Sequence, residues 1–251
     1  MQIENISRYN PGTRFKEILL SNKLPSYDFL SNIEVDRIRK VDPEILYYIA
    51  YHSKPLQAGP VDKEADLGTE ILSDPSIGDS LMLGTLPKRK DQLPETMRLI
   101  LCLNDVIFPD NVGSMIQSAH SIGGVDAIIG TEKTCDFYGW KVLEASRGLG
   151  YQIPKQVISK PDELLSVIKK HNLLPIVGDA NEGQDISNLD IKDYSGIAVI
   201  VGNEKHGPTP PVRDMAVKVR IPIDIHSLNV GVAGGILLQI AKSVLNRNSL
   251  R

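Results

Sequence analysis

From Leu99 onward the chain alternates short apolar runs with segments of helical period, and this rhythm constrains the fold more than any other feature of the sequence. Strands are predicted at Leu99–Leu103, Ala127–Ile129, Leu174–Gly178, Ile197–Val201 and Val217–Ile221. Strands that alternate with helices are joined by crossover connections, which place neighbouring strands parallel. We therefore predict an α/β domain with a parallel sheet and helices on both faces.

Two helices are predicted between these strands. One has apolar residues spaced by three and four, a polar residue at its start and a glycine pair at its end. Its apolar positions are Val112, Met115, Ile116, Ala119 and Ile122, its N-cap is Asp110 or Asn111, and its end is Gly123-Gly124. The other is Pro161–Lys170, whose first acids and last lysines match the helix dipole.

A third helix, from about Asn229 to Asn246, is predicted to close the domain. Its predicted buried residues are Ala233, Ile236, Leu237, Ile240 and Val244, and its glycines are Gly231, Gly234 and Gly235. Glycine inside a helix costs about 1 kcal/mol relative to alanine. Three of them indicate a close approach, either by a partner subunit or by another segment of the chain.

Residues 1–94 have a different pattern and are predicted to form a small, mainly helical or α+β N-terminal domain or extension with a linker, followed by a domain over 95–251. Helices are predicted over 12–23, 34–40 and 43–52. Lys88-Arg89-Lys90 lies beside the boundary, either as a solvated linker or as a contact for phosphate.

Composition limits the possible functions. No run approaches the ~18 apolar residues of a membrane span, and the N-terminus carries no targeting pattern, so we expect a soluble cytoplasmic protein. The two cysteines and five histidines lack metal-ligand spacing, so no metal site is expected. The net charge is −3, so an RNA partner would need a local patch or a surface assembled across subunits.

Three segments place small and polar residues at predicted strand ends, where open α/β sheets bind ligands. In Asp110–Ala119, Gly113 and Gln117 share a face that either meets a ligand or is merely solvated. In Ile200–Gly207, glycines next to Glu204 either admit a ligand to the backbone or form a simple turn. In Ile221–Val230, Ser227 and Asn229 are candidate helix caps. The glycine patterns of a Rossmann dinucleotide site and of a P-loop are both absent.

Together and in this order, the three segments resemble the motifs of the SpoU (TrmH) family of RNA 2'-O-ribose methyltransferases, within the SPOUT superfamily. The matching residues are Asn111-Val112-Gly113, Gly202-Asn203-Glu204, Ile221-Pro222 and Ser227-Leu228-Asn229-Val230, with Ala145-Ser146-Arg147-Gly148 and Ile153-Pro154 between them. Single motifs would be weak, but about 150 residues are covered. Agreement of all of them by chance is improbable.

The resemblance implies a C-terminal trefoil knot, a rare exception to the rule against knots. It also implies a homodimer, S-adenosylmethionine as cofactor, and 2'-O-methylation of tRNA or rRNA. The implied cofactor contacts are Gly178, Gly202, Ile221, Leu228 and Asn229, and the implied catalytic residues are Asn111, Gln117, Glu204, His226, Ser227 and Asn229.

Two departures from the family pattern bear on catalysis. Gln117 stands where the family has a catalytic Arg, and an amide cannot act as a base or replace a guanidinium. Glu144 stands where many relatives have a basic residue. His226, Glu204 or Arg147 could take over the missing role, and histidine is attractive because the ordinary pKa of its side chain suits a general base. The alternatives are a catalytically silent relative that binds RNA as an assembly or structural factor, and a methyltransferase with another acceptor.

Overall fold

The chain divides into two compact units, whose described residues fall within 10–89 and 90–251. The computed structural model describes residues 14–21, 33–41, 82–85, 91–179, 182–221 and 228–249.

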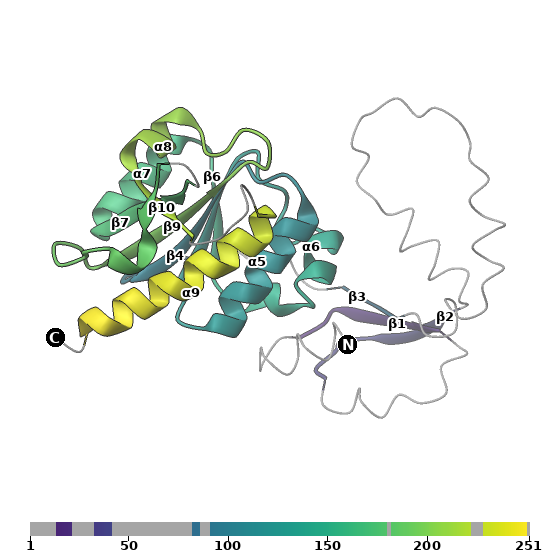
Figure 1. The fold of residues 1–251 in the computed structure, drawn as a ribbon. Coiled ribbons are helices and arrows are strands. Elements are labelled where there is room, and N and C mark those ends of the chain that lie inside the picture. Colours follow the sequence, from purple (N-terminus) through teal and green to yellow (C-terminus); the bar gives the residue numbers. More distant parts are fainter. Residues whose placement is uncertain are drawn as a thin grey trace, which may run out of the picture. The chain divides into compact units, whose positions relative to one another are not determined.

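The described residues of the smaller unit form a three-stranded sheet in the order β2-β1-β3 (Figure 1). β1 (Glu17–Ser21) pairs in parallel with β2 (Ile38–Val41) and antiparallel with β3 (Met82–Thr85). The helices predicted over 12–23 and 34–40 are therefore wrong where the structure describes them. Ile18 and Leu20 are both buried, so the segment alternates as a strand does, and pairing with its neighbours outweighs the local helical spacing. The predicted helix 43–52 and the cluster 88–90 lie outside the described residues.

The larger unit contains a seven-stranded sheet in the order β6-β5-β4-β9-β7-β10-β8, in which every described pairing is parallel. The strands are β4 (Leu99–Asn104), β5 (Ala127–Thr131), β6 (Lys155–Ile158), β7 (Leu173–Gly178), β8 (Gln184–Asp185), β9 (Gly196–Gly202) and β10 (Val217–Arg220). The predicted parallel α/β sheet is confirmed, and five strands fall where the sequence predicts them. The sequence analysis missed β6 and β8, which are short and lie at the two edges.

Five α-helices connect or follow these strands in the described part of the larger unit. They are α5 (Pro109–Ile122), α6 (Trp140–Ala145), α7 (Pro161–Lys170), α8 (Pro210–Met215) and α9 (Val230–Ser249), with 3-10 turns at Leu149–Tyr151 and Ile186–Asn188. α7 has the predicted bounds, and Gly123 ends α5 at φ 71°. The N-cap of α5 is Phe108 and not Asp110 or Asn111, because the helix begins at Pro109. None of the described helices is long and apolar enough to cross a membrane.

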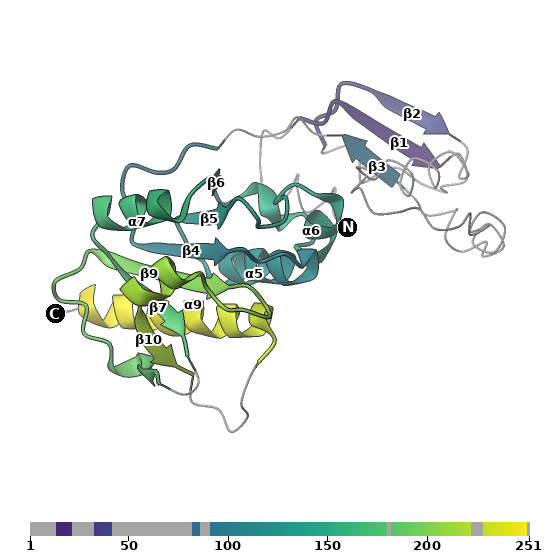
Figure 2. The ribbon, with the colours of Figure 1, turned by 90° about the horizontal axis from the view of Figure 1, so that it is seen from above.

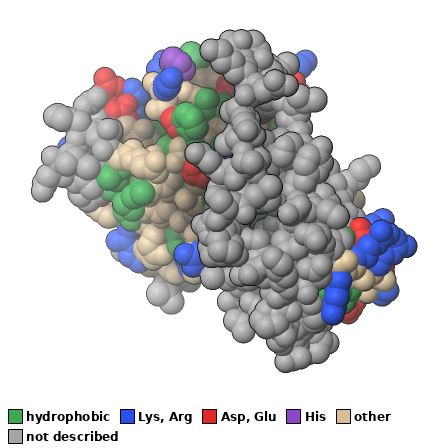
Figure 3. All heavy atoms as spheres, turned by 90° about the vertical axis from the view of Figure 1, so that its right-hand side faces the viewer, with side chains coloured by type: hydrophobic (Ala, Val, Ile, Leu, Met, Phe, Trp, Pro, Cys, Tyr) green, Lys and Arg blue, Asp and Glu red, His purple; other side chains and the backbone are tan. Residues whose placement is uncertain are grey.

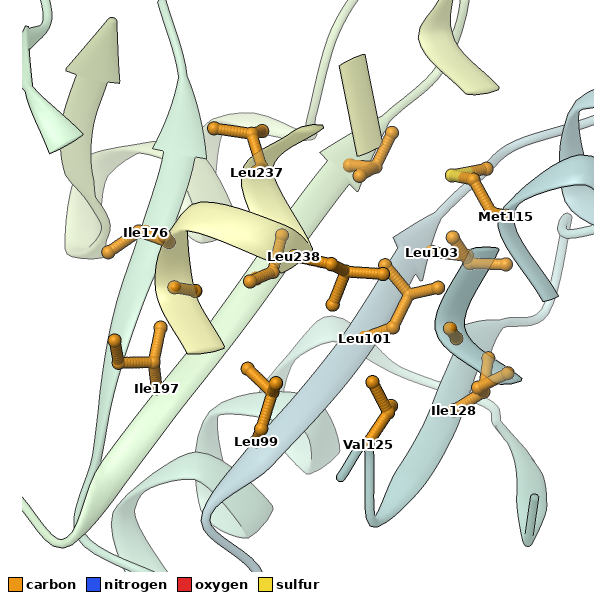
Figure 4. Packing of buried hydrophobic residues seen from close by; sticks show 14 of the residues in the cluster. Leu99, Leu101, Leu103, Met115, Val125, Ile128, Ile176, Ile197, Leu237 and Leu238 are labelled. Carbon is orange, nitrogen blue, oxygen red and sulfur yellow. The ribbon is translucent and has the colours of Figure 1, made fainter. Parts of the chain in front are cut away.

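The sheet lies between two layers of helices (Figures 1 and 2). Alternate residues of β4 face opposite layers: Leu99, Leu101 and Leu103 belong to one buried cluster, and Ile100 and Cys102 to the other. The first cluster includes residues of α5, α6 and α9, as Figure 4 shows in part, and the second includes residues of α7 and α8. Helices on both faces are thereby confirmed.

α9 packs against α5, and its glycines let the two helices come close together (Figure 2). A Cβ on Gly234 would lie 2.7 Å from Sδ of Met115, and one on Gly235 would lie 3.1 Å from Oγ of Ser118. Of the two explanations for these glycines, the structure supports a close segment of the same chain. The predicted burial of α9 holds for Leu237 and Val244, whereas the other three predicted residues, Ala233, Ile236 and Ile240, are half-buried.

Candidate functional site

The loops after β4 and β9 meet at the point where the strand order of the sheet reverses. β4 and β9 are neighbours, but from β4 the chain continues outward through β5 and β6, whereas β7, β10 and β8 lie beyond β9. The ends of parallel strands lie at one edge, and the carboxyl edge at such a switch point is where open α/β sheets bind ligands. The residues that follow Asn104 and Gly202 are therefore the candidate site.

The loop after β4 begins with a strained residue that its neighbours hold in place. Asp105 has φ 61°, in the left-handed region that non-glycine residues seldom occupy. Its N–H donates to Oγ1 of Thr131 at 2.8 Å, its carboxylate accepts from the same hydroxyl at 2.6 Å, and its carbonyl accepts from Nδ2 of Asn203 at 2.9 Å. Strain of this kind persists where surrounding contacts over-determine it, commonly at functional sites.

Glu204 connects the β9 loop to the start of α5. Its carboxylate accepts hydrogen bonds from the N–H groups of Ile107 at 3.4 Å and Phe108 at 3.1 Å, and from Nδ2 of Asn111 at 3.0 Å. Partial burial acts to raise the pKa of Glu204, but bonds from Asn111 and from backbone N–H groups outweigh it, so the pKa is lowered. Glu204 is therefore a carboxylate at neutral pH and a weaker base than an ordinary glutamate.

Asn111 also joins Glu204 to the start of α9. Its Oδ1 accepts from Nδ2 of Asn229 at 3.0 Å, and Oδ1 of Asn229 caps α9 by accepting from the N–H groups of Gly231 and Val232 at 2.9 and 3.2 Å. Glu204, Asn111 and Asn229, here called the Glu204 network, come one from each of the three segments that the sequence analysis singled out. The predicted cap by Asn229 is confirmed.

Gln117 and Gly113 lie elsewhere on α5. Six residues separate Gln117 from Asn111, a rise of about 9 Å along a helix and a different side of it. Among the residues that the structure describes, no hydrogen bond joins Gln117 to the Glu204 network. Gly113 is buried under α6, since a Cβ on it would lie 2.4 Å from Cβ of Ala145 and 2.9 Å from N of Ser146. The expectation that a ligand lies over Gly113 is wrong, because α6 occupies that place.

The glycines of the β9 loop form a turn. A Cβ on Gly202 would lie 2.0 Å from N of Pro208, and Gly207 has φ 67°. Asn203 and Gly207 pair with each other, and Oδ1 of Asn203 accepts from the N–H groups of Lys205 and His206 at 3.0 and 3.2 Å. Of the two explanations offered for these glycines, the close return of the chain is the one that the structure supports.

The predicted cofactor contacts fall at the same carboxyl edge. Gly202, Gly178 and Ile221 end or directly follow three adjacent strands, β9, β7 and β10. Gly178 is exposed and is paired with Val219 of β10. Leu228 is half-buried just before Asn229, while His226 and Ser227 lie outside the described residues.

Two residues of this edge, Asp105 and Thr131, were missed by the sequence analysis, and Asn203 was quoted there only as part of a matching motif. The available signal was that each follows or ends an apolar strand with a polar group, as Glu204 does. Cys135, also near this edge, is half-buried; burial, then Glu204 and Asp136, raise its pKa to about 11, so the thiol is protonated at neutral pH. Within the described ranges, no three His, Cys, Asp or Glu side chains are placed to hold a metal ion.

A seven-stranded parallel sheet with a polar network at its switch point defines an α/β protein whose site lies at the carboxyl edge. The chain belongs to the SpoU rRNA methylase family, whose model matches residues 98–239. This confirms the resemblance seen in the sequence.

Curated relatives match part of the chain. An uncharacterized tRNA/rRNA methyltransferase of Borreliella burgdorferi is 31% identical over 170 residues, which are 64% of this chain and 73% of that protein. The 23S rRNA (guanosine-2'-O-)-methyltransferase RlmB of Blochmanniella floridana is 26% identical over 67% of this chain and 65% of its own length. The 23S rRNA (guanosine(2553)-2'-O)-methyltransferase RlmP of Bacillus subtilis is 30% identical over 57% of each chain. The match thus spans less than two thirds of the last two relatives.

Solved structures show the same fold. The SpoU methyltransferase AviRb from Streptomyces viridochromogenes, in complex with the cofactor AdoMet, superposes with a TM-score of 0.74 at 17% identity, over 99% of this chain and 88% of AviRb. The A. aeolicus TrmH/SpoU tRNA modifying enzyme gives 0.51 at 21% identity, over 62% of this chain and 80% of that one.

Proposed function

We propose that this chain transfers a methyl group from S-adenosylmethionine to a ribose 2'-hydroxyl of tRNA or rRNA. The observation that carries the proposal is the Glu204 network, because it joins the three family segments at the switch point of the sheet. The names of RlmB and RlmP support RNA as the acceptor, and the AviRb complex supports the cofactor.

The residues of the carboxyl edge fit S-adenosylmethionine through backbone chemistry. Gly178 is exposed beside the ends of β9 and β10 although it is paired with Val219, so a ligand can approach its backbone. A flat adenine can be recognised by such groups without charged side chains, which agrees with the glycines and apolar residues found there. We propose Gly178, Gly202, Ile221, Leu228 and Asn229 as its contacts.

When bound, the cofactor supplies an electrophilic methyl group. The chain must then hold the acceptor oxygen in line with that methyl and accept its proton. We propose that Glu204 orients Asn111 and the β4 loop, and that Asn111 and Asn229 position the acceptor ribose. Glu204 is a positioning residue in this scheme, because its lowered pKa and its three donors make it a poor proton acceptor.

The proton acceptor is proposed to be His226, and Ser227, the next residue in the sequence, is proposed to take part in the same catalytic step. Gln117 cannot take this part, since an amide is no base at neutral pH. Arg147 is proposed to supply the positive charge that Gln117 lacks. Arg147 is exposed and directly follows Ser146. Ser146 packs on Gly113, which lies one helical turn before Gln117 on α5.

We also propose the trefoil knot and the homodimer. β10 lies beyond β7, yet α9 returns to pack on β9, β4 and α5. α9 therefore lies at the middle of the sheet although it follows an outer strand, and this arrangement supports a threaded C-terminal segment. Light scattering of the purified protein is expected to give twice the chain mass; a monomer would contradict the dimer.

The experiment that tests the function has two steps. Calorimetric titration with S-adenosylmethionine is expected to show binding at about one molecule per chain in the micromolar range of ordinary cofactor sites. Tritiated cofactor is then incubated with unmodified tRNA and rRNA transcripts, and we expect label that resists alkaline cleavage, as 2'-O-methylation requires. Binding of RNA without transfer would instead indicate a silent relative.

Variants separate the proposed roles. His226→Ala is expected to lose most of the transfer and to keep cofactor binding, whereas an undiminished rate would remove His226 from the mechanism. Arg147→Lys is expected to retain more transfer than Arg147→Gln, because lysine keeps the charge. Lys192→Ala is the control for removing a surface cation, and it should leave methyl transfer unchanged. Lys192 is exposed, and its described ion pair is with the nearby Asp190 at 3.2 Å.

A further inference from the structure

The loop between β4 and α5 exposes two large apolar residues beside the Glu204 network. Ile107 is 46% exposed and Phe108 is 47% exposed. The N–H groups of both donate to the Glu204 carboxylate, so their backbone is fixed at the carboxyl edge. An aromatic ring thus lies open to solvent next to the residues proposed to position the acceptor ribose.

The fold does not explain a phenylalanine at position 108. Phe108 is the N-cap residue of α5, with φ −85° and ψ 118°, and its side chain makes no capping hydrogen bond. Short polar side chains are preferred at this position because their oxygens accept the first free N–H groups of a helix. The side chain of Phe108 makes no capping hydrogen bond and is not fully buried, so its ring is available for another contact.

The ring is carried by a rigid segment. The carbonyl of Phe108 accepts from the N–H groups of Asn111 and Val112 at 3.1 and 3.2 Å. Two residues earlier, the carbonyl of Val106 accepts from the N–H of Cys135 at 3.1 Å, and the strained Asp105 is held by Thr131 and Asn203. A fixed backbone favours binding because little conformational entropy is lost when a ligand stacks on the ring.

Charge around the ring is mixed. Lys133 and Lys205 are exposed on the two flanking loops, but Glu132 and Asp136 are exposed there as well. Figure 3 shows cations, anions and hydrophobic groups among the described side chains of the face that it views. A phosphate patch is therefore not the distinguishing feature of this edge, and the open aromatic ring is.

We propose that Phe108 is a stacking platform for the base of the acceptor nucleotide, with Ile107 extending its apolar surface. This inference rests on the proposed function and deepens it. Proteins that recognise single-stranded RNA stack splayed bases on aromatic rings. Such stacking accepts any base, since every base has a π face. Phe108 thus holds the nucleotide while other parts of the RNA determine which one is chosen.

The test compares four variants with the wild type on whichever transcript accepts methyl label. Phe108→Ala is expected to raise the KM for RNA about 5-fold to 150-fold, the range for losing one base–aromatic stack. Phe108→Trp should stay near wild type because it keeps a ring, whereas Phe108→Leu should resemble alanine because it keeps only apolar volume. Val157→Ala is the matched control, since Val157 is 50% exposed on β6, at one edge of the sheet. Titration with S-adenosylmethionine should be unchanged in all four.

The outcomes distinguish this inference from the function on which it rests. If the wild type methylates RNA and Phe108→Ala matches Val157→Ala, the platform is refuted and the function stands. If the wild type methylates neither tRNA nor rRNA, the proposed function fails. Stacking on Phe108 is then tested with an oligomer that contains ethenoadenosine, whose fluorescence changes on stacking. Equal affinities of wild type and Phe108→Ala for this oligomer would refute the platform. A change of oligomeric state in Phe108→Ala by light scattering would show instead that the ring contacts a second copy of the chain.

Discussion

Two carboxylates in the larger unit bind similar donors but lie in different surroundings. Asp91 accepts from the hydroxyl of Tyr138 at 2.6 Å and from the N–H of Lys155 at 2.9 Å, and it lies 3.9 Å from Nζ of Lys155. The side chains of Asp91 and Lys155 are each 1% exposed, whereas Glu204 is half-buried at the carboxyl edge. A carboxylate that accepts from backbone N–H groups can therefore either stabilise the fold or organise a functional site. Its burial and the segments that it joins indicate which of these roles it has.

The largest expected effect is on the buried side of this comparison. Nζ of Lys155 also donates to the carbonyls of Gly150 and Ile153 and lies 5.0 Å from the centre of the Tyr138 ring. Lys155→Met removes the cation of a buried ion pair, and breaking such a pair typically costs about 3–5 kcal/mol. Urea unfolding followed by fluorescence of Trp140, the chain's single tryptophan, measures it.

The control for this prediction is Lys192→Met. Lys192 and Asp190 pair at 3.2 Å with exposed side chains, so their loss should change the free energy of unfolding by less than about 0.5 kcal/mol. Equal effects of the two variants would remove the distinction between the Asp91 and surface ion pairs.

Glu204→Gln tests the other side of the comparison. The glutamine keeps the size of the side chain but replaces one accepting oxygen with an NH₂ group that faces donors. We expect a loss of about 1–2 kcal/mol in unfolding free energy, because hydrogen bonds to a charged group are weakened. Methyl transfer should fall by about tenfold or more, since the acceptor is mispositioned. A stability loss as large as that of Lys155→Met with unchanged transfer would make Glu204 purely structural.

A smaller effect is expected in the pH dependence of stability. Because the pKa of Glu204 is lowered in the folded protein, the unfolded chain takes up this proton first as the pH falls. The stabilisation is complete above the ordinary glutamate pKa of about 4.3 and is lost as the pH falls through the folded pKa. The difference in unfolding free energy between wild type and Glu204→Gln should therefore shrink as the pH falls below about 4.3. A constant difference would contradict the lowered pKa.

The sequence predicted the segments of the site better than their contacts. Asn111, Glu204 and Asn229 could be selected because small and polar residues follow apolar strands and match the family motifs. The hydrogen bonds among these three residues could not be predicted, because they depend on which strands are neighbours. β4 and β9 are neighbours in the sheet but are separated by about 90 residues in the sequence. The Asp91 network left no local pattern either, because Asp91, Tyr138 and Lys155 come from three separate segments.

The errors in the fold have similar causes. The sheet of the smaller unit pairs β1 with strands that begin 21 and 65 residues after it, and no local spacing reports such pairing. β6 was missed because two of its four residues, Lys155 and Gln156, are polar, which breaks the apolar run expected of a parallel strand. α6 and α8 have six residues each, too few to show a helical period.

The smallest expected effect is on the packing beneath the Glu204 network. A Cβ on Gly231 would lie 3.1 Å from Oδ1 of Asn229 and 3.4 Å from the carbonyl oxygen of Asn111, so Gly231→Ala must displace part of the network. Gly235→Ala meets only the side chain of Ser118, which can rotate, and alanine improves the helix by up to about 1 kcal/mol. We expect Gly235→Ala to be neutral or slightly stabilising with full transfer, and Gly231→Ala to lose about 0.5 kcal/mol and a measurable part of the transfer rate. Equal transfer rates in the two variants would mean that the network tolerates movement, and the contrast between Glu204 and Asp91 would then rest on burial alone.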